Sequence, residues 1–88
     1  IASYSILVHL IAQWCNLDVG DFIYTLGDAH IYSNHIKQCN LQLSRETYGL
    51  CSLDVSAAKY KTLETLTFDD IIVNNYKSHK AIKAKISI

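Results

Sequence analysis

Proline and methionine are both absent from this chain of 88 residues. Average usage of about 5% would place about four prolines in a chain of this length. There are only three glycines, and the eight basic residues balance eight acidic ones, so the formal net charge is zero. A neutral chain is not typical of a nucleic-acid-binding surface, which is normally basic. The hydrophobic content of 50% excludes an intrinsically disordered chain.

Charged residues are also missing from the first 17 positions. A signal peptide would begin with basic residues and end at a small-residue cleavage site. A membrane span would need about 20 mainly apolar residues. This run has no basic start, and polar side chains interrupt it, so a buried helix is the preferred interpretation and no membrane partner is expected. The interrupting residues are Ser3, Ser5, His9, Gln13 and Asn16.

The expected first helix is apolar around most of its circumference, because its polar residues occupy only one narrow line. A helix of this kind belongs in the interior of a large protein. The remaining ~70 residues are too few to cover it. The chain also begins with Ile1 rather than methionine. We therefore expect it to be a piece of a longer protein, with much of the covering structure elsewhere.

The rest of the chain predicts a mixture of strands and helix with short connections, and no linker divides it, so we expect an α+β fold. A helix whose N-terminus is capped by the side chain of Ser33 or Asn34 should turn Ile36, Cys39 and Leu43 inward and leave its polar residues Lys37, Gln38 and Gln42 outside. The expected elements are a strand at 22–26, an extended segment at 29–32, that helix to about residue 44, and short strands at 53–55 and 71–73.

The three cysteines, Cys15, Cys39 and Cys51, lack CxxC spacing and form an odd set. This pattern favours a reducing, cytoplasmic location over a disulfide framework. Small buried hydrophobic side chains are their simplest interpretation. His30, His35 and Cys39 are too weak a pattern for zinc, so no metal is expected.

Alternation along the segment after Gly27 gives a more informative pattern. Side chains of an extended chain alternate between faces, so Asp28, His30 and Tyr32 should project together while Ala29 and Ile31 point into the core. An imidazole and a phenol about 7 Å apart can both hydrogen-bond one hydroxyl group. The alternative is a polar seam without a ligand, and spacing alone leaves both open.

The run from Gly20 to His35, continued by Leu41–Glu46 and preceded by Ile1–Tyr4, resembles the C-terminal third of thymidylate synthase. The resemblance continues more thinly through Phe68–Asp70 to the end of the chain. It implies that residues 1–88 are the C-terminal part of a single domain whose N-terminal two thirds are absent. Enzymes of this family methylate deoxyuridylate (dUMP) to thymidylate with 5,10-methylenetetrahydrofolate as co-substrate, and they are homodimers.

Carried over by position, the resemblance assigns His30 and Tyr32 to the 3′-hydroxyl of the nucleotide's deoxyribose. Ile31 lies in the same nucleotide-binding segment but faces the other way. The family's last residues fold over the bound folate, a role that falls here on Ser87 and Ile88 and on Ile86 before them. Ser87 stands where alanine is usual, so only a backbone contact is expected of it. The strand at 22–26 is expected in the large sheet that packs against the second subunit.

Departures from the family pattern limit what these residues can do alone. None of the cysteines has the Pro-Cys-His context of the family's nucleophile, so no catalytic residue is expected here and the 88 residues alone should be inactive. The residue that selects uracil over cytosine would precede Ile1. A pyrimidine nucleotide hydroxymethylase, or a non-catalytic remnant acting as a dimerisation piece, therefore stays open.

The missing prolines are the largest departure from the family. Other residues stand where the family usually has prolines, and each suitable proline stabilises a fold by about 0.4–1 kcal/mol. We therefore expect looser loops and a looser closing tail. The replaced positions are 47–51, Ser78, Lys80 and Lys85.

Overall fold

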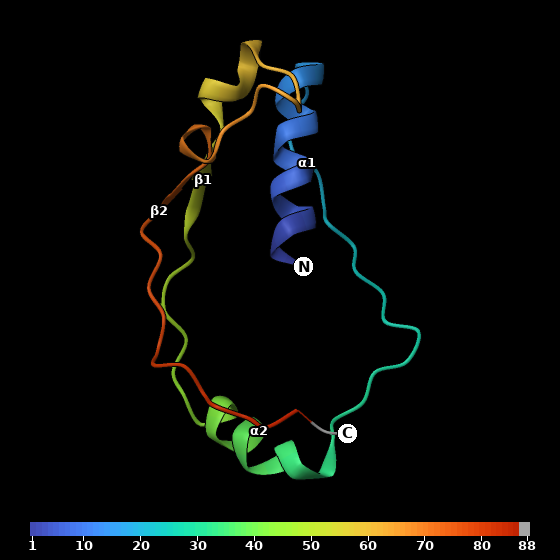
Figure 1. Cartoon of the computed structure of the whole chain (residues 1–88), viewed down its shortest axis with the longest axis vertical. Helices are drawn as coiled ribbons and strands as arrows, with labels where there is room; N and C mark the ends of the chain where they lie inside the picture. The colour runs from blue at the N-terminus through green and yellow to red at the C-terminus, as the bar shows by residue number, and fades with distance from the viewer. Residues whose placement is uncertain (87–88) are drawn as a thin grey trace. The chain divides into compact units, whose positions relative to one another are not determined.

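The structure is a computed structural model that describes residues 1–86. The chain forms two compact units (Figure 1). The first unit comprises Ile1–Thr25 and Leu50–Tyr76, and the second comprises Leu26–Gly49 and the chain from Lys77 onward. The structure contains helices and a small antiparallel sheet, which confirms the predicted α+β class. The elements in chain order are α1 (Ala2–Cys15), η1 (Ser33–His35), α2 (Ile36–Leu43), β1 (Ser52–Asp54), η2 (Ser56–Tyr60), η3 (Phe68–Asp70) and β2 (Ile72–Asn74).

Helix α1 confirms the helix predicted from the charge-free opening run. It ends at Cys15, and the next residue, Asn16, adopts the left-handed conformation with φ of 53°. The N–H of Leu17 then donates to the carbonyl of Ala12 over 2.9 Å. Asparagine tolerates this conformation better than most residues, and the returning hydrogen bond satisfies a carbonyl at the helix end. The helix therefore stops shortly before the acidic residues begin.

Strands β1 and β2 confirm the two short strands predicted in the second half of the chain. They pair antiparallel, with Leu53 opposite Val73 and Asp54 opposite Ile72. Each strand is only three residues long. A two-stranded ribbon is marginal in water by itself, so it depends on packing against a helix.

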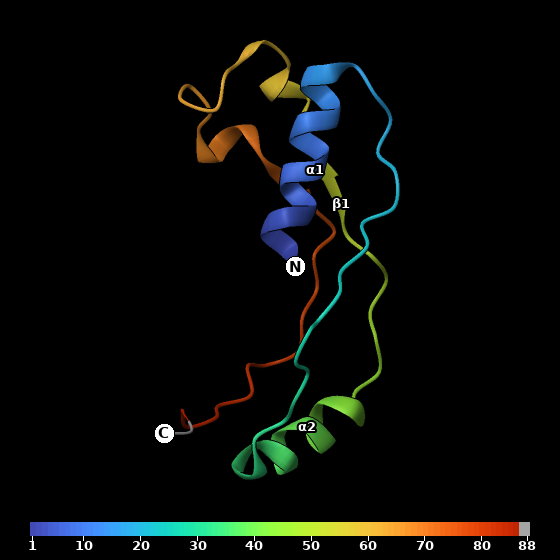
Figure 2. The same ribbon diagram turned by 90° about the vertical axis from the view of Figure 1, so that its right-hand side faces the viewer.

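The core of the first unit lies where α1 meets β1 and η2 (Figure 2). Ala58 is fully buried, and Leu10 and Val55 are 4% and 7% exposed. The indole N–H of Trp14 donates to the carbonyl of Ala58 over 2.9 Å. This bond and the apolar contacts fix α1 on η2. Half-buried side chains surround this cluster: Ile6, Trp14, Leu53, Leu66 and Ile71.

Asp70 is a buried carboxylate that ties the turn before η3 to η2. Both of its oxygens lie 2.7 Å from the ammonium of Lys61. One oxygen also accepts hydrogen bonds from the N–H and the hydroxyl of Thr67, each over 2.7 Å. These donors favour the charged form, Lys61 most strongly, and lower the pKa of Asp70 to about 2. Asp70 therefore stays ionised through most of the acid range.

Helix α1 is only partly covered, although the sequence predicts a buried helix. Only Leu10 and Ala12 are buried, whereas Tyr4 is 65% and Ile11 48% exposed. The predicted shortage of covering residues explains this, because other residues of the first unit pack against only one side of α1. Within residues 1–86, no helix is long and apolar enough to cross a membrane.

Helix α2 confirms the predicted second helix, but its predicted inward face is wrong for Ile36 and Leu43, while Cys39 of that face is half-buried. Ile36 is 54% and Leu43 83% exposed, whereas His35, Gln38 and Cys39 are half-buried. The chain that packs on α2 within this unit is the polar segment after Lys77, and that segment is held through hydrogen bonds to its backbone. Ile36 and Leu43 therefore remain uncovered in this unit.

The predicted side-chain cap of the second helix is also wrong. A 3₁₀ turn leads into α2, and neither it nor the helix has a side-chain capping hydrogen bond. The turn is instead closed by the N–H of His35, which donates to the carbonyl of Tyr32 over 2.9 Å. A backbone hydrogen bond thus satisfies one of the N–H groups at the start of the helical segment, as a capping side chain would.

The strand predicted at 22–26 is not formed in the described chain. The residues have the expected composition, and the rings of Phe22 and Tyr24 lie 6.3 Å apart between their centroids. A strand, however, requires a neighbouring strand to accept its hydrogen bonds. Within residues 1–86, the only ladder is that of β1 and β2, so this segment has no partner strand here.

The prediction that the cysteines are buried is wrong for Cys15 and Cys51, which are exposed; Cys39 is half-buried. All three are free thiols. Cys15 lies on the last turn of α1, and Cys51 precedes β1, where a chain of this size has few residues to cover them.

Candidate functional site

His30 and Tyr32 lie side by side in the second unit. Their ring centroids are 5.2 Å apart, and the rings meet edge to face at 72°. The predicted proximity of these two side chains is therefore confirmed. Tyr32 is 50% exposed, so its phenol is accessible to a ligand. An imidazole and a phenol in this arrangement offer both donors and acceptors to one small polar group.

Asp28 orients the imidazole of His30. Its Oδ1 lies 3.4 Å from Nδ1 of His30, and the two side chains are 90% and 53% exposed. The carboxylate favours a proton on Nδ1. In the neutral imidazole this leaves Nε2 with a lone pair that can accept a hydrogen bond from a hydroxyl. The alternation that predicted the shared face thus also provides an orienting group.

Ile31 is 65% exposed, so the prediction that Ala29 and Ile31 point into a core is wrong within this chain. Ala29 is exposed as well. The alternation of an extended segment holds, but it requires a second layer to pack against, and the described residues provide none at this segment. Ile31 therefore separates the two polar side chains in sequence without adding a polar contact.

His35 joins the pair from the other side, a role that the sequence reasoning missed. Its ring meets that of Tyr32 edge to face at 85°, with centroids 5.7 Å apart. Its Nε2 lies 2.7 Å from the carbonyl oxygen of Lys85. The available signal was the i, i+3 spacing from Tyr32 to His35, which places both on one side of the 3₁₀ turn. Ser87 and Ile88, predicted to contact folate, lie outside the described residues.

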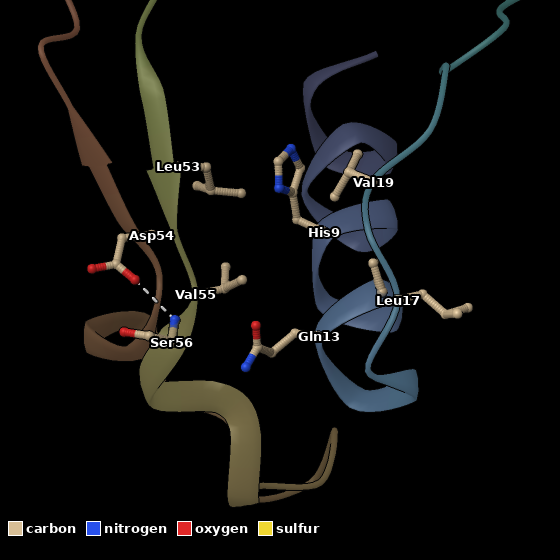
Figure 3. A pocket seen from close by; sticks show the side chains of 9 residues that line it. His9, Gln13, Leu17, Val19, Leu53, Asp54, Val55 and Ser56 are labelled. Carbon is tan, nitrogen blue, oxygen red and sulfur yellow. Dashed lines mark hydrogen bonds between the residues drawn. The ribbon is translucent and has the colours of Figure 1, made fainter.

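A separate hollow of about 280 Å³ lies in the first unit, between α1 and β1 (Figure 3). His9 and Gln13 extend from α1 toward Leu53 and Val55. The carboxylate of Asp54 points away from the helix and accepts a hydrogen bond from the N–H of Ser56 over 2.9 Å, which lowers its pKa. Asp54 is thus occupied by its own turn, and no convergent set of polar groups marks this hollow as a ligand site.

Metal ligands do not cluster in the described part of the chain. Among residues 1–86, no three His, Cys, Asp or Glu side chains are arranged to hold an ion. His30 and His35 flank Tyr32, but His35 directs its Nε2 at a backbone carbonyl.

Comparisons with known proteins cover the whole chain. The thymidylate synthase family profile matches residues 1–88. A thymidylate synthase of Francisella philomiragia is 53% identical over all 88 residues, and one of Francisella tularensis subsp. holarctica is 51% identical. The chain spans 32% of the length of each of these relatives. The crystal structure of thymidylate synthase from T4 phage matches 99% of the chain with a TM-score of 0.78 at 39% identity, over 34% of its own length.

The structural match includes the segment of His30 and Tyr32 and residues of both units. Sequence and fold therefore indicate the same family. The chain therefore belongs to the thymidylate synthase family.

Proposed function

We propose that these 88 residues act as part of a thymidylate synthase that methylates dUMP to thymidylate. In this proposal His30 and Tyr32 hydrogen-bond the 3′-hydroxyl of the deoxyribose, and Ile31 is a bystander between them. The observation that carries the proposal is the pairing of these two rings, 5.2 Å apart. Asp28 supports it, because the carboxylate beside Nδ1 leaves Nε2 of His30 for the ligand.

A hydroxyl group suits this pair better than an anion. The side chains nearest the two rings are Asp28, which would repel an anion, and His35, whose Nε2 is engaged with a carbonyl. The nucleotide's phosphate would therefore be held by residues other than these.

The second substrate in this proposal is 5,10-methylenetetrahydrofolate, which supplies the transferred carbon and its reducing equivalents. Ser87 and Ile88 would close over it, so that water is excluded while both substrates are bound. The working protein is proposed to be a cytoplasmic homodimer, with 22–26 completing its strand pairing in the larger sheet. Neither a metal nor a nucleic acid is required, and no catalytic nucleophile is assigned to these 88 residues.

The test uses a chimera in which residues 1–88 replace the matching 88 residues of the Francisella philomiragia thymidylate synthase. We expect the chimera to bind dUMP and to form thymidylate, whereas the 88 residues alone do neither. His30→Ala and Tyr32→Phe should each weaken dUMP binding by about 1–3 kcal/mol, or about 5- to 140-fold in Kd, because each leaves a ligand hydroxyl without one partner. Tyr60→Phe is the matched control, since Tyr60 is 90% exposed.

A second ligand isolates the contact. The monophosphate of 2′,3′-dideoxyuridine lacks the 3′-hydroxyl, so His30→Ala and Tyr32→Phe should change its Kd little in the same calorimetric titrations. Equal losses for both ligands would mean that these side chains support the fold and do not bind the hydroxyl. Unchanged affinity for dUMP in both variants would refute the assignment.

A further inference from the structure

Side chains at both ends of α2 hold the chain after Lys77 by its backbone. The guanidinium of Arg45 donates from Nη1 to the carbonyl of Lys80 over 2.8 Å. Nε2 of His79 lies 2.8 Å from the carbonyl oxygen of Glu46, and its ring stacks on Tyr48 with centroids 4.6 Å apart. Residues 77–86 are named here the terminal segment. Hydrogen bonds to backbone carbonyls and a ring stack therefore hold this segment near the C-terminal end of α2.

His35 holds the terminal segment at the other end of α2. Because a carbonyl oxygen only accepts, Nε2 of His35 must carry the hydrogen that bridges the 2.7 Å to Lys85. The same ring lies edge-on to Tyr32. His35 is half-buried, whereas Tyr32 and Lys85 are exposed. One imidazole therefore contacts both Tyr32 and the terminal segment.

We propose that His35 is a positioning residue that links the nucleotide pair, His30 and Tyr32, to docking of the terminal segment on α2. This inference rests on the proposed function for the identity of the nucleotide, and it adds a residue to which that function gives no role. The two contacts of His35 share one ring, so a change in its side-chain torsions alters both of them.

The physical consequence is a coupling between two sites. A ligand that bonds the phenol of Tyr32 restricts the rotation of that ring, and the ring edge of His35 is then restricted with it. Nucleotide binding therefore already removes part of the conformational freedom of His35. Forming the hydrogen bond to Lys85 afterwards then costs less conformational entropy. By linkage, the docked segment must favour nucleotide binding by the same factor.

Hydrogen exchange of residues 80–86 in the chimera, with and without saturating dUMP, tests the link. We expect dUMP to slow exchange in the unmodified chimera by about 2- to 12-fold, the factor that one hydrogen bond supplies. His35→Phe keeps an aromatic edge for Tyr32 but has no donor, and His35→Gln keeps a donor but has no ring. Each should abolish the dUMP-dependent protection, because the link needs both contacts.

His79→Phe is the matched control. It keeps a ring to stack on Tyr48 and loses the hydrogen bond to Glu46, so it should loosen the segment equally with and without dUMP while the dUMP-dependent change persists. If that change also persisted in both His35 variants, or if bound dUMP produced none in the unmodified chimera, the inference would be overturned. A chimera that fails to bind dUMP would overturn the proposed function, while nucleotide-free exchange of His35→Phe would still decide whether His35 holds the segment.

Discussion

The isolated 88-residue chain should not unfold cooperatively, because it buries too little surface. The chain exposes 8059 Å², whereas a compact monomer of 9.9 kDa exposes about 5,200 Å². The excess is about 2,900 Å². If slightly more than half of it is apolar, as protein surfaces are, the missing burial corresponds to about 40 kcal/mol at 25 cal/mol per Å². That figure is several times the net stability of an ordinary domain, which is about 5–15 kcal/mol.

The assay combines calorimetry with the fluorescence of Trp14, the single tryptophan of the chain. We expect no calorimetric transition for the isolated chain, a red-shifted emission from Trp14, and binding of the hydrophobic dye ANS. The chimera should show a cooperative transition and little dye binding, because its other residues cover the exposed face of α1. A soluble monomer of the 88 residues with a sharp thermal transition would refute this reasoning.

Three further predictions concern contacts within the two units, each measured in the chimera. The folded pKa of Asp70 is about 2, below the ordinary value of 3.8. Its ion pair with Lys61 therefore stabilises the folded state fully above about pH 5, and this stabilisation is lost as the pH falls from about 5 to about 2. The Tm of Asp70→Asn should therefore lie furthest below that of the parent near pH 7 and converge with it toward pH 2; a constant difference would contradict this. Trp14→Phe removes one donor from the carbonyl of Ala58, which still accepts from the N–H of Lys61 over 3.0 Å, so urea denaturation followed by circular dichroism should show a loss of about 0.5–1.5 kcal/mol for the bond. Lys80→Pro keeps the carbonyl that Arg45 uses, and a restored proline should slow hydrogen exchange of the terminal segment, by about 2- to 5-fold for 0.4–1 kcal/mol; faster exchange would mean that the backbone there does not accept proline.

Local pattern was sufficient for the elements whose partners lie nearby in the sequence or whose signals are intrinsic. The charge-free run predicted α1, the alternation of apolar and polar residues predicted β1, and a β-branched run predicted β2. Alternation placed His30 beside Tyr32 because the period of an extended chain is a property of the backbone alone. Each of these predictions depends on only a few neighbouring residues.

Predictions failed where they assumed an environment. The strand at 22–26, the inward face of α2 with Ile36 and Leu43, and the core position of Ile31 all presuppose a second layer of structure. Apolar character states that a side chain favours burial, but not whether residues are available to bury it. In the described chain they are not, so these side chains are exposed.

The sequence by itself determined the family, the α+β class, the helix α1 and the pairing of His30 with Tyr32, because these follow from residue order and backbone period. Only the tertiary structure decided that His35 contacts both Tyr32 and the carbonyl of Lys85, 50 residues further along the chain. It likewise decided that Lys61 and Thr67 surround Asp70. A hydrogen bond between distant residues depends on how the chain returns in space, and no local pattern specifies that return.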